Sequence, residues 1–363
     1  MRVMVIFGGR SREHEVSLAS ASAIMDALQE SGRYEVLPVG ITREGQWISS
    51  GDPMRELESR VREFAGKHAG PERGPSTGSR TAAANFARAS AKLPVDLGAV
   101  DVVFPVLHGP YGEDGTVQGV LELAGVPYVG SGVMASAVGM DKVTMKKIFA
   151  FHGLPQVEWL GLTRKEWEDN RKRWIREVET SLGYPCFVKP SNLGSSVGIS
   201  KATNAEELRA ALDAAAELGR RLIVEQGVDA REIEVSVLGN EEAKVSVPGE
   251  VVVSEHEFYD YEAKYTEGGC ELIAPAQIPG GVMTEVRRIA RAAYAAIDAA
   301  GMARVDFFLE RGAERLLLNE INTIPGFTST SVYARLWEAS GLSYEQLLDR
   351  LMQLALERHS PGS

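Results

Sequence analysis

The sequence VMVIFGGRSREHE, residues 3–15, opens the chain and decides the class of fold. Its first five residues are all apolar, the pattern of a strand buried on both faces of a parallel sheet. The polar, glycine-containing segment behind them predicts a turn. Ser17 is placed to cap a helix that runs to about Glu30, and Gly32 ends it. Residues 34–41 predict a second strand, and this order of strand, helix and strand predicts an α/β fold.

Composition places the chain among folded globular proteins. Apolar residues make up 44% of its 363 positions and charged residues 25%. At roughly 150 residues per domain, this length predicts two or three domains. The 39 basic and 50 acidic residues give a formal net charge of −11, which argues against a nucleic-acid partner. Cys186 and Cys270 have no metal-binding spacing, so we expect two buried thiols in a reducing cytosol.

The sequence predicts neither a targeting peptide nor a membrane segment. The first apolar run is too short for a signal peptide, and charged residues follow it. The longest uncharged stretch, residues 123–140, holds four glycines and Pro127. It therefore predicts turns and close packing of small residues rather than a membrane span. We expect a cytoplasmic protein without a membrane partner.

Hydrophobic periodicity divides the rest of the chain into further elements. Residues 66–90, rich in Gly, Ala, Pro, Ser and Arg, predict a mobile surface insertion. A buried strand at 100–107 ends in the polar loop 108–115, where ligands gather in open α/β sheets. The other predicted elements are helices at 141–152, 203–219 (a Thr203–Glu206 capping box), 284–300 and one opened by a Ser343–Gln346 capping box, and strands at 186–189, 222–225, 233–238, 244–253, 303–309 and 315–322.

The last two predicted strands, joined by a short turn around Gly312, carry the strongest chemical signal. Side chains alternate along a strand, so Arg304 and Asp306 share one face. Glu320 and Asn322 likewise share a face. In the matching hairpin register Asp306 lies opposite Glu320. Arg304 then lies opposite Asn322, and three oxygen ligands meet one arginine. Such ligands suit Mg²⁺, above all where phosphates complete its shell. An ordinary solvated face of a sheet fits the pattern equally well.

Two lysines suggest a phosphate site. Lys189 ends a strand directly before the Ser/Gly-rich loop 191–198. Glycines let backbone N–H groups approach an anion closely, and the lysine adds a positive charge. Lys142 stands near a predicted helix start. Taken singly, the loop and either lysine are as typical of an ordinary surface.

One short motif allows a different class of enzyme. Residues 194–198, GSSVG, match the G-x-S-x-G pattern of serine hydrolases, which would make Ser196 a nucleophile. Such a triad needs a histidine further along the chain, and His256 is the one candidate outside the C-terminal tail. A serine hydrolase is therefore the alternative from another class.

A second short motif favours packing over function. Residues 130–135, GSGVMA, match a dinucleotide-binding fingerprint. The acid expected about 20 residues on would be Glu158, which follows a helix rather than a second strand. We interpret these residues as close packing of small side chains.

Six segments, in the same order along the chain, resemble those of D-alanine–D-alanine ligases, an ATP-grasp family. They are GGRSREHEVSL (8–18), LHG (107–109) with GEDG (112–115), MDK (140–142), VKP (188–190) with GSSVG (194–198), FYDYEAKY (258–265) and NEINTIPGFT (319–328). The resemblance runs from residue 3 to about 350. Residues from about 47 to 91 are the part that it does not match.

The resemblance implies an ATP-grasp fold with three subdomains. These are an N-terminal open α/β domain for substrate (1–130), a central ATP-grasp subdomain (131–225) and a C-terminal subdomain with the metal site (226–363). It implies that ATP activates one D-alanine as an acyl phosphate and that the amine of a second one attacks it. The product would serve peptidoglycan precursors, and we expect a homodimer. A ligase that takes D-serine second is the alternative within the fold; the intact run 259–265 favours an amine acceptor.

The resemblance also implies an ATP and metal site. Lys142 and Lys189 would clamp the phosphates of ATP. The remaining positions are Ser196 in the loop over the phosphates, Glu225 and Glu232 on the adenine and ribose side, Lys264 at the transferred phosphate, and Asp306, Glu320 and Asn322 as ligands of two Mg²⁺ or Mn²⁺ ions. The metal ions would offset the repulsion between phosphates.

A second group of positions would bind the amino acids. Glu13 would hold the ammonium of the first substrate, with His108 close by, and Ser195 and Tyr265 would be linked to Glu13 by hydrogen bonds. Arg304 and the backbone N–H of Gly326 would stabilise the tetrahedral oxyanion. Ser331 and the backbone at Val332 would bind the carboxylate of the second substrate.

Overall fold

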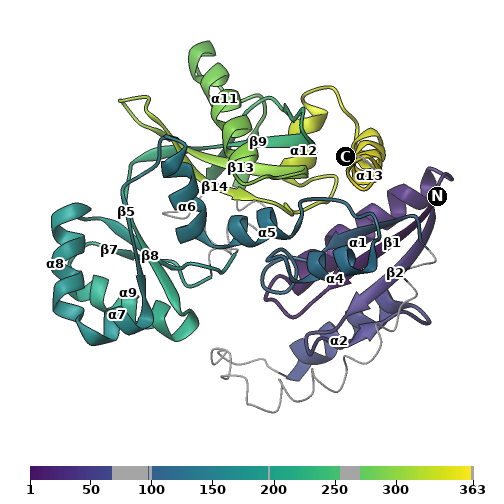
Figure 1. Ribbon diagram of the computed structural model, residues 1–363, viewed down its shortest axis with the longest axis horizontal. Coiled ribbons are helices and arrows are strands. Elements are labelled where there is room, and N and C mark those ends of the chain that lie inside the picture. Colours follow the sequence, from purple (N-terminus) through teal and green to yellow (C-terminus); the bar gives the residue numbers. More distant parts are fainter. Residues whose placement is uncertain (68–96, 98–99, 195–196, 254–269, 361–363) are drawn as a thin grey trace.

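The computed structural model describes residues 1–67, 97, 100–194, 197–253 and 270–360, so the predicted insertion at 66–90 lies almost wholly outside the described residues. The chain begins with a four-stranded sheet in the order β3-β2-β1-β4 (Figure 1). Its strands are β1 (Arg2–Gly8), β2 (Glu35–Ile41), β3 (Trp47–Ile48) and β4 (Val102–Val106), and the helices beside it are α1 (His14–Glu30), α2 (Pro53–Lys67) and α4 (Thr116–Ala124). β1 pairs in parallel with both β2 and β4.

The opening strand is buried on both faces, as its continuous apolar run predicted. Val3, Val5 and Phe7 join a core shared with α1 and the C-terminal helix α13 (Tyr344–Arg358). Met4 and Ile6 join a second core with α4. The α/β opening of the chain is thereby confirmed.

Ser17 does not cap α1, so that prediction is wrong. The helix begins three residues earlier, at His14, and Ser17 is a fully buried residue of its second turn. The backbone N–H of Gly8 donates to the Ser17 hydroxyl oxygen over 2.8 Å, and this hydroxyl donates to the carbonyl of Val106. Ser17 therefore joins the helix to the ends of β1 and β4.

A second sheet, in the order β5-β8-β6-β7, is antiparallel throughout. It contains β5 (Trp159–Thr163), β6 (Cys186–Pro190), β7 (Ser200–Ala202) and β8 (Arg221–Gln226), with helices α7 (Arg164–Asp169), α8 (Arg171–Ser181) and α9 (Ala205–Leu218). Cys186 is a free, buried thiol in its core, and burial raises the pKa of this thiol to about 11. The side chain of Cys270 is not among those that the structure describes.

The predicted Thr203–Glu206 capping box of α9 does not form. Asn204, not Thr203, caps the helix: its side chain accepts from the backbone N–H groups of Glu206 and Glu207. The Glu207 carboxylate in turn accepts from the N–H of Thr203 over 2.8 Å. Both neighbours are good capping residues, so the sequence pattern alone does not choose between them.

A third sheet carries the predicted hairpin. Its order is β12-β11-β9-β13-β14, with β10 also paired to β9, and all pairs are antiparallel. The strands are β9 (Ala230–Gly239), β10 (Lys244–Val245), β11 (Gly249–Val253), β12 (Cys270–Ile273), β13 (Gly301–Glu310) and β14 (Leu316–Asn322). The single strand predicted at 244–253 is thus two short strands, separated at Pro248, which has no N–H for a sheet.

The third sheet has one apolar and one polar face in β13. Ala303, Val305 and Phe307 pack into a core with α11 (Gly280–Ala296) and α6 (Lys142–Phe151). The α11 helix begins four residues before the predicted start. The residues between those three, Arg304 and Asp306, face the other way, into a cavity. α5 (Val133–Met140) precedes α6, and α12 (Val332–Glu338) and the capped α13 follow the hairpin.

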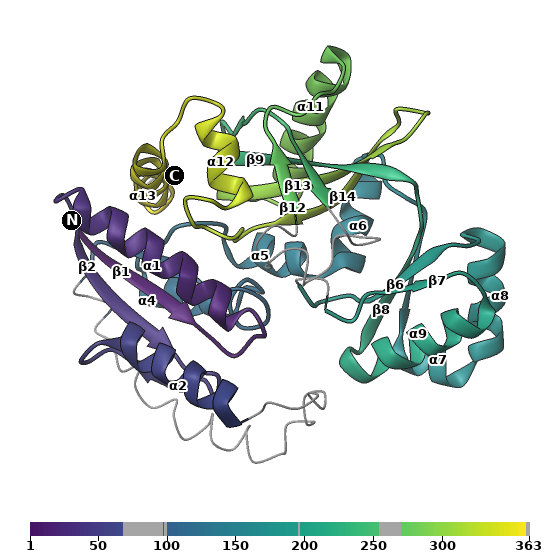
Figure 2. The same cartoon turned by 180° about the vertical axis from the view of Figure 1, so that it is seen from behind.

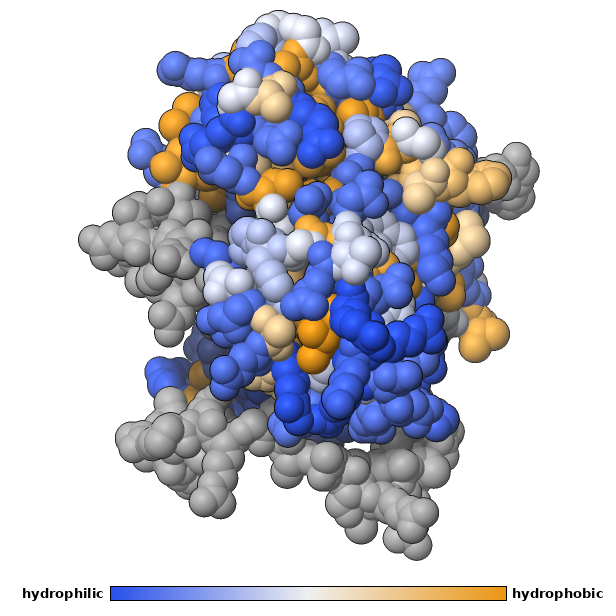
Figure 3. Space-filling view, turned by 90° about the vertical axis from the view of Figure 1, so that its left-hand side faces the viewer, coloured by the Kyte–Doolittle hydropathy of each residue, from blue (hydrophilic) through white to orange (hydrophobic). Residues whose placement is uncertain are grey.

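The three sheets surround a central region that α5 and α6 enter (Figure 1; Figure 2). The unit built on the second sheet lies apart from the helix α13, which rests against α1. The side of the molecule where α8 lies is largely hydrophilic (Figure 3), and Lys172, Arg173 and Arg176 of α8 are exposed. Within the described ranges, no helix has the length and apolar character that a membrane crossing requires.

Candidate active site

A cavity of about 740 Å³ lies between the three sheets. Every predicted site residue that the structure describes lines it. Glu13 and His108 lie next to the first sheet, Lys189 and Glu225 lie on strands of the second sheet, and Lys142 is the first residue of α6. The third unit contributes Glu232, Arg304, Asp306, Glu320, Asn322, Gly326, Ser331 and Val332. Residues far apart in the sequence therefore meet at one place, while their individual roles stay predictions.

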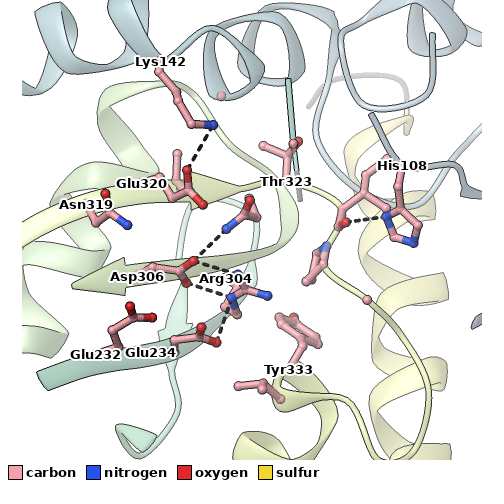
Figure 4. Close-up of a pocket in the computed structure, with 18 of the residues that line it drawn as sticks. His108, Lys142, Glu232, Glu234, Arg304, Asp306, Asn319, Glu320, Thr323 and Tyr333 are labelled. Atoms are coloured by element: carbon pink, nitrogen blue, oxygen red, sulfur yellow. Dashed lines mark hydrogen bonds and ion pairs between the residues drawn. The ribbon is translucent and has the colours of Figure 1, made fainter. Parts of the chain in front are cut away.

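The hairpin brings its four polar side chains together in the predicted register. Asp306 pairs with Glu320, and Arg304 pairs with Asn322. The Arg304 guanidinium donates two hydrogen bonds to the Asp306 carboxylate, over 2.8 and 2.7 Å (Figure 4). The Asn322 amide donates to the same carboxylate over 3.0 Å. A register shift directly after Asp306 then ends this regular pairing.

Glu234 is a site residue that the sequence reasoning missed. It is buried on β9, opposite Asp306 on β13, and its carboxylate lies 2.9 Å from the guanidinium of Arg304. Arg304 is thus held between two carboxylates, which fixes the direction of its remaining N–H groups. The alternation of Glu232 and Glu234 along β9 is the signal that could have found it.

Lys142 connects the start of α6 to the hairpin. The Asp141 side chain caps the helix by accepting from the N–H of Thr144, which places Lys142 in the first turn. Its ammonium lies 3.2 Å from Glu320 and donates to the carbonyl of Leu193 over 3.3 Å. Burial acts to lower the pKa of Lys142, but the Glu320 carboxylate outweighs it and raises this pKa. Lys142 is therefore a cation at neutral pH.

Glu225 is held between two lysines. Its carboxylate is 3% exposed, with one oxygen 2.5 Å from the ammonium of Lys189 and the other 2.9 Å from that of Lys146. Burial acts to raise the pKa of Glu225, but Lys146 and Lys189 together lower it to about 2. Lys146 was not predicted, although it lies one helical turn after Lys142.

His108 presents a neutral imidazole to the cavity. The side chain is 5% exposed, and burial lowers its pKa, so the ring is neutral at pH 7. Its Nδ1 lies 3.1 Å from the carbonyl of Ile324, which can only accept, so Nδ1 carries the hydrogen. Nε2 then offers a lone pair, and it has no hydrogen-bond partner among the described residues.

Two acidic side chains stand close to this imidazole. Glu113, which also lines the cavity, lies 3.9 Å from His108, and burial raises its pKa well above the usual value. The Glu13 carboxylate is approached closely by two glycines. A Cβ on Gly109 would lie 2.8 Å from a Glu13 oxygen, and one on Gly194 would lie 3.2 Å away. Glycine at both positions therefore leaves room for the loops around Glu13.

The segment after the hairpin lines the opposite part of the cavity. Gly326, Ser331 and Val332 all contribute to its wall. The N–H of Thr328 donates to the Ser331 hydroxyl oxygen over 2.9 Å, and the two hydroxyl oxygens lie 2.7 Å apart. These bonds fold the segment into a tight turn at the start of α12. Their predicted contacts with an amino-acid substrate stay predictions.

Four predicted site residues lie outside the described residues. They are Ser195, Ser196, Lys264 and Tyr265. His256, the histidine that a hydrolase would need, lies outside them as well.

The metal prediction can be tested against the donor set. The described ranges hold no group of three or more His, Cys, Asp or Glu side chains that could bind a metal ion. The hairpin supplies two carboxylates and one amide oxygen. The Asp306 carboxylate already accepts from Arg304 and Asn322, and the Glu320 carboxylate lies against Lys142. This set fits Mg²⁺ only where phosphate oxygens complete the shell, which is how Mg²⁺ is usually held beside a nucleotide.

Solved structures define the class of protein. The D-alanine–D-alanine ligase from Coxiella burnetii superimposes with a TM-score of 0.78 at 33% identity, over 99% of this chain and 94% of that one. The VanG D-Ala:D-Ser ligase from Enterococcus faecalis gives 0.78 at 34% identity, over 98% and 99%. The predicted α/β architecture is thereby confirmed as an ATP-grasp fold, and fold and cavity together define an ATP-grasp ligase.

Sequence comparisons then give the family. The family model for the D-ala D-ala ligase N-terminus matches residues 2–131, and the model for the C-terminus matches residues 148–353. The D-alanine–D-alanine ligase of Heliobacterium modesticaldum is 50% identical over 358 residues, 98% of this chain and 95% of the relative. That of Geobacillus thermodenitrificans is 46% identical over 99% and 96%. The chain belongs to the D-alanine–D-alanine ligase family.

Proposed function

We propose that this chain joins two D-alanines into D-alanyl-D-alanine with the cleavage of ATP to ADP and phosphate, for peptidoglycan precursors. The observation that carries the proposal is the convergence of Lys142, Lys189, His108 and the Arg304–Asp306 pair on one cavity. The near full-length identity to relatives of that name supports it.

The reaction needs two bond-forming steps. A carboxylate oxygen of the first D-alanine attacks the γ-phosphorus of ATP, the bond to the leaving ADP oxygen breaks, and an acyl phosphate forms. The amine of the second D-alanine then attacks the acyl carbon, loses a proton, and displaces phosphate as the new C–N bond forms. An acyl phosphate reacts readily with water, which is why such a step is placed in a cavity closed to solvent.

The positions of Lys142 and Lys189 support a binding site for the phosphates of ATP beside them. Both lysines line the cavity, and Lys142 donates to the carbonyl of Leu193 in the loop that begins at Ser191. Asp306, Glu320 and Asn322 would hold the Mg²⁺ ions, which would stabilise charge on the transferred phosphoryl group. Arg304, fixed by Asp306 and Glu234, is oriented to donate to an oxyanion at the acyl carbon.

The properties of Glu13 and His108 support a binding site for the first amino acid beside them. The carboxylate of Glu13 is suited to an ammonium group, and the Nε2 lone pair of His108 can accept one of its hydrogens. A protonated imidazole would instead repel the ammonium, so the buried, neutral state of His108 fits this role. The second amino acid would lie toward Ser331, on the far side of Arg304.

D-Alanine is favoured over D-serine as second substrate. The relatives named as D-alanine–D-alanine ligases reach 50% identity. The D-Ala:D-Ser ligase structure stands at 34% identity. The serine-hydrolase alternative loses its basis, because the chain belongs to a ligase family over nearly its whole length.

We also propose the cytoplasm as the site of action and a homodimer as the assembly. An enzyme that consumes ATP for a precursor is served by the ATP pool of that compartment. Two large apolar side chains on helices that contact each other, Leu123 of α4 and Met134 of α5, are 92% and 58% exposed. Exposed apolar residues that gather in one patch are common where chains associate. Light scattering of the purified protein would report the mass, and a monomer would refute the dimer.

The proposed activity has a direct assay. We expect that ATP, Mg²⁺ and D-alanine together give phosphate and ADP in equal amounts. L-Alanine in place of D-alanine should give only background, and D-serine offered with limiting D-alanine should add little. Absence of any phosphate that depends on D-alanine would refute the proposed function.

A further inference from the structure

Lys146 stands behind the nucleotide site without lining it. The side chain is 1% exposed on α6, one turn after Lys142, and it is absent from the cavity wall. Its ammonium lies 2.9 Å from Glu225, whose other oxygen lies 2.5 Å from Lys189. Removing a charged lysine from water is unfavourable unless an opposite charge lies close to it. A lysine buried this deeply therefore needs its contact with Glu225.

The three side chains carry a net charge of one. Two ammonium groups share one carboxylate, so Glu225 cancels only one of the two positive charges. With Lys146 removed, Glu225 and Lys189 would form a neutral pair at 2.5 Å. Lys142 does not replace the lost charge, because Glu320, 3.2 Å away, already lies against it.

We propose that Lys146 is a positioning residue for nucleotide binding: by occupying one oxygen of Glu225, it leaves Lys189 with uncompensated positive charge toward the phosphates. The proposal rests on the proposed function, since it takes this cavity to be the ATP site. Lys146 acts through Glu225 and touches neither nucleotide nor amino acid. Its effect is therefore on affinity for the nucleotide rather than on the chemistry at the acyl carbon.

The variant Lys146→Met tests this charge argument. Its dissociation constant for Mg·ADP, measured by titration calorimetry on the full chain, should rise roughly tenfold or more, because Glu225 then neutralises Lys189 and the phosphates lose the attraction of that lysine. The KM for ATP should rise with it, and the KM for D-alanine should stay within about twofold. Lys146→Arg, which keeps the charge, should bind Mg·ADP within about threefold of the wild type. Lys147→Met, at the exposed next position of the same helix, is the matched control.

A double-mutant cycle separates this role from a merely structural one. In a Glu225→Gln background Lys189 has no carboxylate to neutralise it, so Lys146→Met should weaken Mg·ADP binding there by less than about threefold. An equal loss in both backgrounds would overturn the proposal, and so would unchanged affinity in a folded Lys146→Met. If Lys146→Met does not fold, Lys146→Gln takes its place with the same outcomes. If the wild-type protein forms no dipeptide and binds no Mg·ADP, that result would refute the proposed function rather than the role of Lys146.

Discussion

Single residues in this cavity are defined by what holds them. Arg304 lies between Asp306 and Glu234, Lys142 lies against Glu320, and His108 is fixed by the carbonyl of Ile324. Apart from the Arg304–Asp306 contact within β13, each of these contacts joins elements that are separate in the sequence. The orientation of the reactive groups is therefore a property of the assembled sheets.

Glu320→Gln should abolish turnover. The amide keeps the shape of the side chain but loses the negative charge that pairs with Lys142 and would help to hold Mg²⁺. We expect kcat to fall at least roughly a hundredfold, the size of effect seen when a charged group is lost from a preorganised site. Thermal unfolding should show an intact fold. Near-normal turnover would mean that the hairpin patch is misassigned, and Glu338→Gln, on the exposed end of α12, is the control.

His108 should make the stability of the fold depend on pH. Burial lowers its folded-state pKa below the usual 6.5, so the unfolded chain binds the proton more strongly. The contribution of the neutral imidazole to the free energy of unfolding is fully present above about pH 6.5. It is lost as the pH falls from there toward the lowered pKa, by up to about 1.4 kcal/mol per pH unit. Urea unfolding at pH 7.5 and 5.5 should show a smaller pH effect in His108→Gln. Equal pH effects in both proteins would contradict a neutral, buried His108.

The hairpin patch could be predicted from a local rule, whereas the other predicted site residues rest on the resemblance of six sequence segments to a known family. The period of two along β13 and β14 puts Arg304, Asp306, Glu320 and Asn322 on one patch without knowledge of the rest of the fold. Lys146 has no such local signal. Its role depends on Glu225, which reaches it from β8 of the second sheet, and only the folded chain brings the two together.

At the scale of elements, helix starts were the least predictable feature. A capping residue is defined by its own backbone angles and a bond to the next turn, and several neighbouring residues can satisfy that description. Ser343 and Gln346 form the predicted capping box on α13, whereas α9 has no capping box and is capped by Asn204 instead of Thr203. The sequence predicts that Ser17 caps a helix, but its side chain makes a tertiary contact instead. No local sequence pattern predicts such a contact.

Ser17→Ala tests that tertiary contact. The hydroxyl accepts from Gly8 of β1 and donates to Val106 of β4, so its loss leaves two buried backbone groups without their partner. We expect the free energy of unfolding to fall by about 2–3 kcal/mol, more than the roughly 1 kcal/mol typical of a lost cap. Urea unfolding would measure it, with Ser22→Ala on the same helix as control. A loss below about 1 kcal/mol would contradict the bridging role.

At the scale of the whole molecule, three sheets meet around one cavity. Their strands come from residues 2–106, 159–226 and 230–322. We propose that they correspond to three subdomains, with boundaries near residues 130 and 225. The sheets share few contacts outside the cavity wall and the helices α5, α6 and α13. The cavity wall between them contains all of the predicted site residues that the structure describes.

The net charge of −11 is compatible with an anionic substrate because the cations are local. Lys142, Lys146, Lys189 and Arg304 gather where the nucleotide would lie, while acidic residues dominate the composition as a whole. Added Mg·ATP should therefore stabilise the folded state, by about 2.7 kcal/mol at a hundred times its dissociation constant. A Tm measured with and without Mg·ATP would show this, and an unchanged Tm would contradict a nucleotide site.

The central claim is that this cavity joins two D-alanines through an acyl phosphate. It is tested most directly with D-alanine labelled with ¹⁸O in both carboxylate oxygens, incubated with ATP, Mg²⁺ and the full chain. Mass spectrometry of the products should show D-alanyl-D-alanine and phosphate in which one oxygen is ¹⁸O, because the attacking carboxylate oxygen leaves with the phosphorus. Dipeptide with unlabelled phosphate would contradict the acyl phosphate, and absence of dipeptide would contradict the ligase itself.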